Sequence, residues 1–136
     1  LKDMRDNFDQ TCICLDIALR AKSKDPIVFH KDLMVEHMLL TCSEHMDLRK
    51  TIHPAIAILR DTDSKSKTQL EETLFILIAN HMNMAETAKK IHIHYNTLKY
   101  RVQRIEELTG LDLKDSNTTF QLSLSRRIMD LLSLFP

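Results

Sequence analysis

The sequence contains very little glycine, little proline and no tryptophan. Its 136 residues include one Gly, three Pro and no Trp. Because tight β-hairpin turns depend largely on glycine, this composition leaves little room for hairpins. A glycine-rich loop that holds phosphates needs several glycines, so it is excluded as well. These absences favour a helical fold and argue against an enzyme that binds nucleotides through such a loop.

Long apolar runs and paired cysteines are also missing. No apolar stretch approaches the roughly 18 residues of a membrane span, and no signal peptide is present. The three cysteines, Cys12, Cys14 and Cys42, are odd in number and lack CxxC spacing. We therefore predict a cytoplasmic protein without a membrane segment, in which these residues are reduced and partly buried in the core.

The sequence shows no arrangement of residues that is typical of catalysis or metal binding. No serine, cysteine or pair of carboxylates lies in a recognised catalytic pattern, so no enzymatic activity is expected. His92 and His94 form an HxH pair. A metal site needs three or four converging ligands, and no others lie nearby in the sequence. The sequence thus predicts neither a metal nor a cofactor.

Apolar residues recur at helical spacing along most of the chain. The fold predicted is all-α, a helical bundle, with room for a short strand at residues 27–30 (IVFH). Residues 70–80 are apolar nearly all round, which is typical of a buried helix. Two further helices are expected to bury one stripe each. The stripe of the first helix comprises Met4, Phe8, Cys12, Leu15 and Leu19, and is widened by Ile13 and Ile17. That of the last comprises Phe120, Leu124, Ile128, Leu131 and Phe135, with Leu122 and Met129 as a second apolar edge.

The segment from Asn83 to Gly110 has the pattern of two helices joined by a tight turn. Asn83 is a favourable N-cap, and Glu86 three residues later completes a capping-box pattern. The inner face of the second helix is predicted to contain Leu98, Val102, Ile105 and Leu108. Gly110, the one glycine, is expected to end that helix in a left-handed conformation. This is the pattern of a helix-turn-helix, with helices near residues 84–91 and 95–108.

Positive charge is concentrated on the same segment. Residues 84–105 contain five basic side chains and one acidic one, although the whole chain has a formal net charge of zero. The basic residues are Lys89, Lys90, Lys99, Arg101 and Arg104. Such asymmetry favours docking of a polyanion on this side of the protein. A basic run on a helix is also commonly just a solvated face.

The string HYNTLKYRVQRIEELTGLDL, residues 94–113, resembles the signature of the PucR/CdaR-type C-terminal helix-turn-helix domain of bacterial transcription regulators. The resemblance extends over roughly residues 54–132. It implies a DNA-binding domain whose effector is sensed by a region upstream. Two positions depart from the usual pattern. Tyr95 stands where the family usually has Arg, and His92 stands where many such motifs have a turn glycine, a position that favours left-handed backbone.

The domain boundary is predicted within Asp61–Thr68 (DTDSKSKT), a polar stretch without hydrophobic residues. Residues 1–64 would then form a helical region, the tail of an upstream regulatory domain. Residues 65–136 would form the helix-turn-helix domain.

The candidates for DNA contact are residues of the second helix, because its N-terminal end reaches base edges in this class, together with two lysines of the first helix that would contact phosphates. Asn binds adenine through two hydrogen bonds, and a Thr methyl contacts thymine. The candidate set is His94, Tyr95, Asn96, Thr97, Lys99, Tyr100, Arg101, Arg104, Lys89 and Lys90. Alternatives remain open: His94 or Asn96 as a plain N-cap, and both tyrosines as surface packing.

Arg101 has two interpretations. Helical rotation of about 100° per residue places it about 60° from Leu98, so it is half-turned toward the core. It then either contacts a phosphate or forms an ion pair with Glu71 or Glu72.

The leading hypothesis is therefore sequence-specific binding of duplex DNA by the C-terminal part of a transcription regulator. The helix near residues 95–108 would enter the major groove, and a homodimer would bind paired half-sites. The alternative is a helical module for protein interaction or dimerisation that does not bind DNA.

Overall fold

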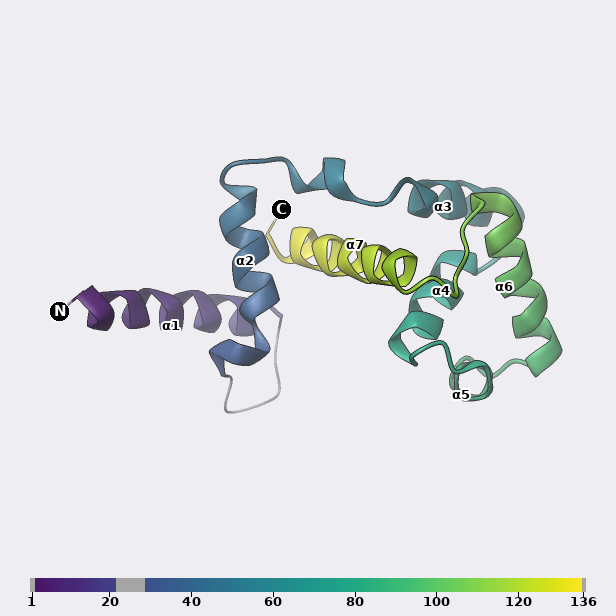
Figure 1. The fold of residues 1–136 in the computed structure, drawn as a ribbon, viewed down its shortest axis with the longest axis horizontal. Helices are drawn as coiled ribbons and strands as arrows, with labels where there is room; N and C mark the ends of the chain where they lie inside the picture. Colours follow the sequence, from purple (N-terminus) through teal and green to yellow (C-terminus); the bar gives the residue numbers. More distant parts are fainter. Residues whose placement is uncertain (1, 22–28, 136) are drawn as a thin grey trace. The chain divides into compact units, whose positions relative to one another are not determined.

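The computed structural model describes residues 2–21 and 29–135, and within these ranges all regular secondary structure is helical (Figure 1). The prediction of an all-α fold is confirmed. The α-helices are Lys2–Arg20 (α1), Met34–Ser43 (α2), Pro54–Ser66 (α3), Leu70–Ala79 (α4), Met84–Lys90 (α5), Tyr95–Thr109 (α6) and Ser116–Leu134 (α7). Two short 3-10 helices, His30–Asp32 (η1) and Leu48–Thr51 (η2), flank α2. Within the described residues, no helix is both long enough and apolar enough to cross a membrane.

The chain divides into two compact units. Unit 1 consists of residues 1–51 and 127–136, and unit 2 of residues 52–126. In unit 1 the buried side chains come from α1, α2, η2 and the end of α7: Cys14, Ile17, Leu39, Leu48, Ile128 and Leu131. The end of α1 is also tied to the C-terminal residues, because the Arg20 guanidinium lies 4.4 Å from the centre of the Phe135 ring.

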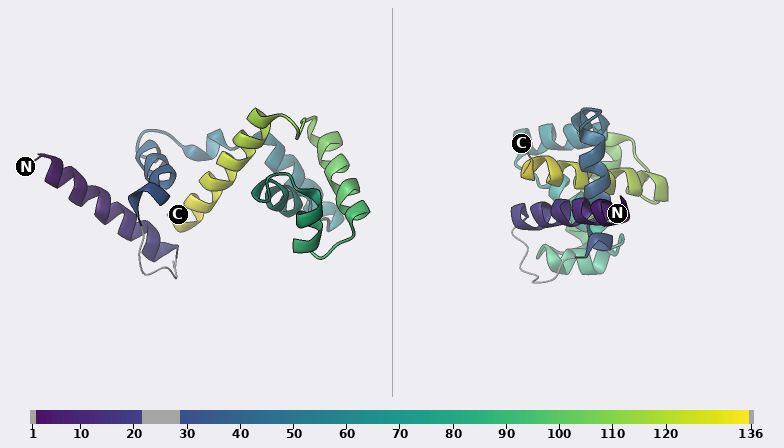
Figure 2. Two further views of the ribbon diagram at one scale, coloured as in Figure 1. Left: turned by 60° about the horizontal axis from the view of Figure 1, so that its bottom comes forward. Right: turned by 90° about the vertical axis from the view of Figure 1, so that its left-hand side faces the viewer.

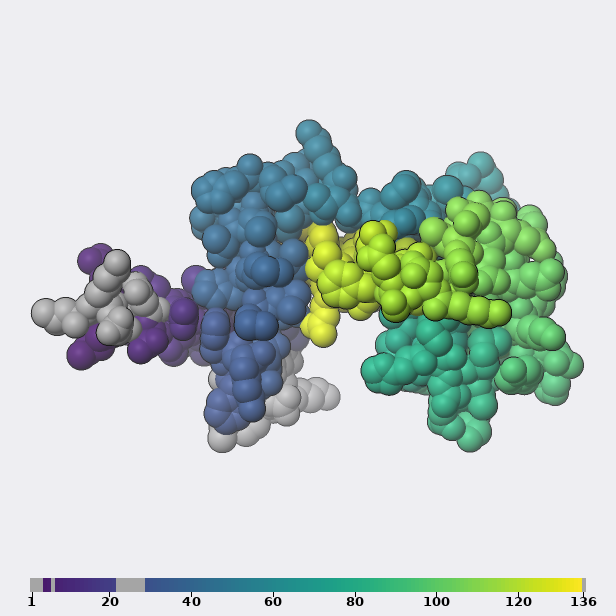
Figure 3. Space-filling model, in the orientation of Figure 1, coloured from purple at the N-terminus to yellow at the C-terminus, as the bar shows by residue number. Residues whose placement is uncertain are grey.

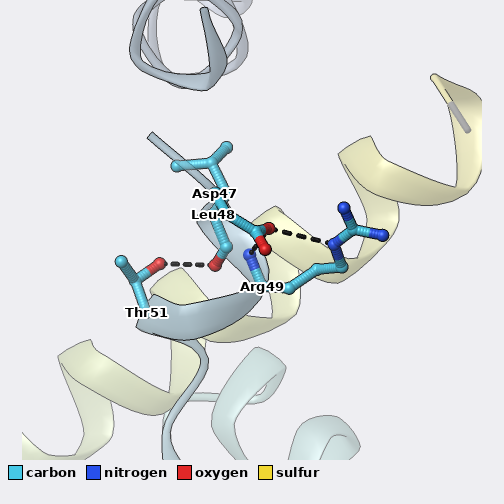
Figure 4. A network of polar contacts seen from close by, with 4 residues as sticks. All are labelled: Asp47, Leu48, Arg49 and Thr51. Atoms are coloured by element: carbon cyan, nitrogen blue, oxygen red, sulfur yellow. Dashed lines mark hydrogen bonds and ion pairs between the residues drawn. The ribbon is translucent and has the colours of Figure 1, made fainter. Parts of the chain in front are cut away.

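The short helix η2 of unit 1 is stabilised by Asp47, the residue just before it, and by Thr51 at its end (Figure 4). The Asp47 carboxylate accepts hydrogen bonds from the backbone N–H of Arg49 at 3.1 Å and from its Nε at 2.9 Å. Thr51 donates its hydroxyl to the Leu48 carbonyl at 2.7 Å. The bonds from Arg49 favour the charged carboxylate and lower the pKa of Asp47.

Unit 2 is built around the apolar helix α4, as the sequence predicted for residues 70–80. Helix α6 packs against α3, α4 and α5, and α5 also contacts α4 (Figure 2). The buried apolar side chains of this unit are Ala55, Ile56, Leu59, Leu70, Leu74, Phe75, Leu77, Ala88, Leu98, Ile105, Leu113 and Leu122. A polar link joins the two ends of the unit: the His53 N–H donates to the hydroxyl of Ser125, a buried residue of α7, at 3.0 Å.

The polar stretch predicted to be a linker is largely helical. Residues up to Ser66 belong to α3, and the two units divide elsewhere than at the predicted boundary between residues 64 and 65. This stretch is also bonded to the next helix, because a residue of α3 caps the start of α4. Gln69 precedes α4 without a side-chain cap, and Asp63 supplies one instead. Its carboxylate accepts from the N–H groups of Leu70 at 2.8 Å and Glu71 at 2.9 Å.

Loss of this cap is expected to destabilise unit 2. Asp63→Ala should lower the free energy of unfolding by about 1–2 kcal/mol, as for other N-cap carboxylates. Asp61→Ala is the matched control, since its carboxylate forms only an exposed ion pair with Lys65, an interaction of about 0–1 kcal/mol. Urea unfolding of the 136-residue chain measures both. Equal effects of the two substitutions would show that Asp63 does not cap α4.

Three expectations about the outer parts of the chain need correction. Residues 27 and 28 of the expected strand lie outside the described residues, while Phe29 is irregular and His30 begins η1. The main stripe predicted for α1 is exposed along its described length, Phe8 at 67%, whereas Ile17 at its edge and Cys14, which was not predicted, are buried. In α7, Phe120 is exposed, but Ile128 and Leu131 of the predicted stripe and Leu122 of the predicted second edge are buried.

Candidate nucleic-acid interface

Helices α5 and α6 form a helix-turn-helix, close to the predicted bounds of residues 84–91 and 95–108. The turn begins with a Schellman motif at the end of α5. The N–H of Ile93 donates to the Ala88 carbonyl at 3.0 Å, and the N–H of His92 donates to the Lys89 carbonyl at 3.2 Å. His92 adopts the left-handed conformation with φ of 55°, as predicted. A histidine therefore holds the turn position that glycine would occupy at lower cost.

The start of α5 is capped as predicted, but by one half of a capping box. The Asn83 side chain accepts from the Glu86 N–H at 3.1 Å. The reciprocal bond is not made, because the Asn83 N–H donates to the Asn80 carbonyl. The Glu86 carboxylate turns instead to Lys89 at 3.1 Å. Asn80 also ties α4 to α5, since its amide donates to the buried Thr87 hydroxyl at 3.3 Å.

Helix α6 has well-defined ends. His94 is its N-cap, and His94 Nδ1 accepts from the Asn96 N–H at 3.2 Å. Gly110 follows the helix with φ of 68°, and its N–H donates to the Glu106 carbonyl at 2.8 Å. The predicted left-handed cap at Gly110 is confirmed, and His94 has the capping role that the sequence had left open against base contact.

Substitution of Gly110 is expected to cost stability through the backbone alone. A Cβ atom there would meet no heavy atom within 4 Å, so steric overlap does not contribute. Gly110→Val should destabilise by roughly 1–2 kcal/mol, the penalty of the left-handed conformation. Gly110→Asn should cost less, because Asn tolerates that region. The melting temperatures of the two variants test this expectation. A valine variant as stable as the parent would contradict it.

The inner face of α6 fixes which side chains point outward. Leu98 and Ile105 are 0% exposed, and the predicted inner residues Val102 and Leu108 are half-buried. The opposite face and the N-terminal end are exposed. There the structure places seven of the ten sequence-predicted residues, all exposed: His94, Tyr95, Asn96, Thr97, Lys99, Tyr100 and Arg104. Arg101 is half-buried on the side of α6 that faces the core. In the space-filling view, α6, drawn in green, forms the outer edge of unit 2 (Figure 3).

Basic side chains border this exposed face. Lys89 and Lys90 lie in the last turn of α5 and are exposed. Lys89 pairs with Glu86 and Arg104 pairs with Glu107 at 3.3 Å, both across exposed surface, where such pairs contribute little. Lys90 and Lys99 have no carboxylate within ion-pair distance among the residues that the structure describes. The positive charge of the pair of helices is therefore available to an anionic partner.

Arg101 is the exception among the candidates. Its Nη1 donates to the Thr73 hydroxyl of α4 at 3.0 Å, and Thr73 is 1% exposed. The alternative of an ion pair with Glu71 is not realised. Arg60 of α3 binds the Glu71 carboxylate through Nη2 at 2.6 Å and Nε at 3.0 Å. This hydrogen-bonded pair raises the pKa of Arg60.

No pattern in the sequence identifies Thr73 or Asp63, because each acts on a helix other than its own. The cysteines lie outside the interface. Cys14 is buried, which raises its pKa, and Cys42 is half-buried, but Cys12 is exposed, contrary to prediction. Among the described residues no three His, Cys, Asp or Glu side chains gather as metal ligands would.

Residues 70–128 match the family described as the PucR C-terminal helix-turn-helix domain. Among curated proteins, the chain is 32% identical over 134 residues to the purine catabolism regulatory protein of Bacillus subtilis (strain 168). It is 39% identical over 74 residues to the proline-responsive transcriptional activator PutR of the same organism. It is 35% identical over 85 residues to the carbohydrate diacid regulator of Escherichia coli (strain K12). No solved structure matches the chain.

The matches cover 98%, 54% and 62% of this chain, respectively. They cover only 25%, 18% and 21% of the relatives, so the chain spans a quarter or less of their lengths. All three are named as regulators or activators, which agrees with the expectation of a non-enzymatic protein. Together with the observed fold of α4 to α7, these matches show that residues 70–128 form a helix-turn-helix domain of the PucR C-terminal type.

Proposed function

We propose that the protein binds duplex DNA in a sequence-specific manner, with the N-terminal half of α6 in the major groove. The observation that supports this most strongly is the two-sided character of α6. Leu98 and Ile105 are fully buried. The exposed side chains at the start of the helix, among them Tyr95, Asn96 and Thr97, therefore point away from the core of unit 2. An α-helix fits the major groove, and side chains at its N-terminal end reach base edges there.

The basic side chains have a different role in the proposal. Lys89, Lys90, Lys99 and Arg104 border the exposed face and are free to approach phosphates. Phosphate contacts position a protein on DNA without reading its sequence. Asn96 and Thr97 carry groups that distinguish bases, an amide and a methyl. Orientation and sequence reading would thus come from separate residues of one surface.

The test is a binding titration of the 136-residue chain with duplex DNA at several salt concentrations. Four phosphate contacts should give a slope of about −3 to −4 in a plot of log K against log salt concentration. Affinity should then fall about a hundredfold between 50 and 200 mM salt. A random duplex pool and a duplex selected from it by the protein separate specific from non-specific binding. Absence of duplex binding at 50 mM salt would favour the alternative, a module for protein interaction.

The relatives supply a proposal for the wider context. Two are named for proline and for carbohydrate diacids, and a third for purine catabolism. This chain spans a quarter or less of each relative. We therefore propose that a small-molecule effector is sensed by a region that corresponds to the rest of the relatives' sequences. We further propose that two copies bind paired half-sites about 34–36 Å apart, the spacing of one DNA turn. Mass measurement of the protein–DNA complex tests the stoichiometry.

A further inference from the structure

We infer that Arg101 is a positioning residue: through Thr73 it fixes the rotation of α6 against α4, and with it the placement of the side chains that read bases. This inference rests on the proposed function. It replaces the interpretation of Arg101 as a phosphate contact.

The position of Arg101 on α6 is the first support. Arg101 lies three residues after Leu98 and four before Ile105, and both of these side chains are fully buried. Residues at these spacings share one side of a helix. The guanidinium is therefore held on the core side of α6, half-buried, while Lys99 and Tyr100 beside it are exposed.

The partner of Arg101 is itself fixed. The Thr73 hydroxyl donates to the carbonyl of Gln69, the residue just before α4, and accepts from Arg101 at 3.0 Å. Both hydrogen-bonding roles of that hydroxyl are thus used. The first turn of α4 is in turn anchored to α3 by the Asp63 cap and by the pair of Arg60 with Glu71. A chain of directional bonds therefore runs from α3 through α4 to α6.

Hydrogen bonds fix the rotation of a helix about its axis more sharply than apolar packing does. Leu98 and Ile105 resist removal from the core, but small rotations of a helix change such contacts only gradually. Side-chain tips lie about 5–6 Å from a helix axis, so a rotation of about 10° moves them by about 1 Å. Hydrogen bonds to base edges hold only within about 2.7–3.2 Å, so such a shift breaks them. Loss of the bond between Arg101 and Thr73 should therefore impair sequence reading more than overall attraction to DNA.

The test compares Arg101→Gln, Thr73→Val and the double variant with the parent. The parent first selects a preferred duplex from a random pool, and affinities for this duplex and for random DNA are then measured across salt concentrations. We expect each single variant to reduce the preference ratio by roughly tenfold, the range of one lost base contact. The double variant should lose no more than either single variant, because both remove the same interaction. The salt slope should stay at the parental value.

A purely structural role would not give this pattern, since general destabilisation leaves the preference of the folded fraction unchanged. Arg101→Lys serves as a further control, because it keeps the charge but lacks the rigid fork of donors. It should behave like Arg101→Gln. A slope lowered by about one in Arg101→Gln, with Thr73→Val binding like the parent and Arg101→Lys restoring binding, would identify a phosphate contact and overturn the inference. Failure of the parent itself to bind duplex DNA would overturn the proposed function as well, and the two failures are distinguishable by that measurement.

Discussion

Replacing both Lys99 and Arg104 by alanine should weaken binding to every duplex alike, by roughly fiftyfold at 0.1 M salt. Each phosphate contact releases close to one counterion, so the salt slope should fall by about two. Both side chains are exposed, and among the described residues their one ion pair, Arg104 with Glu107, lies on the surface. Their loss should therefore change stability by less than about 1 kcal/mol.

The matched control is the double substitution Lys65→Ala with Lys114→Ala. These two lysines are exposed, carry the same total charge and belong to the same unit, but lie outside α5 and α6. The control should retain the parental slope. If both double variants lose affinity equally, the attraction to DNA reflects net charge alone, and the basic border of α6 has no special role.

Leu98→Ala should have the largest effect on stability, about 2–5 kcal/mol, because a fully buried leucine leaves a cavity when it is shortened. Leu98 is 0% exposed and lies on the inner face of α6, among the fully buried Leu74, Leu77 and Ile105 of the same unit. For a unit of this size, each kilocalorie corresponds to about 4–8 °C in melting temperature. The variant should therefore melt at least about 8 °C below the parent.

Gln103→Ala on the exposed face of α6 is the control and should change stability by less than about 0.5 kcal/mol. If Leu98→Ala is too unstable to purify, Ile105→Val should cost about 0.5–1.5 kcal/mol at the neighbouring core position. Thermal unfolding followed by circular dichroism measures all three. A Leu98→Ala variant that melts like the parent would show that α6 is not packed on this face.

The sequence predicted local features of unit 2 well, because they depend on residues close together in the chain. The left-handed cap at Gly110, the cap at Asn83 and the bounds of α5 and α6 all follow from patterns within a few residues. The left-handed turn at His92 was predicted by comparison with the glycine usual there. Each of these features is decided by local backbone geometry, which sequence patterns report directly.

Features that join distant segments were not predictable in this way. Asp63 caps a helix that begins seven residues later, so a polar stretch that resembles a linker becomes part of the unit. Arg101 donates to Thr73 and not to Glu71, whose carboxylate binds Arg60 from another helix. Hydrogen-bond partners of this kind depend on which helices pack together, and the periodicity of one helix does not predict that packing.

The buried faces of the outer helices show a similar limit. The apolar stripe of α1 predicted an inner face that includes Phe8 and Cys12, yet both are exposed and Cys14 is buried. Helical spacing identifies an apolar stripe, but α1 has several apolar positions around its circumference. Which of them is covered is decided by the neighbouring elements.

The most direct test of the central claim is a map of backbone amide shifts in the ¹⁵N-labelled 136-residue chain on addition of its selected duplex. We expect the largest changes at residues 92–104, from the turn before α6 through its first turns, with smaller ones at Lys89 and Lys90. Residues of α1 and α2 should keep their positions in the spectrum. Saturating changes that centre on other helices, with His94 to Thr97 unperturbed, would contradict the assignment of α6 as the recognition helix.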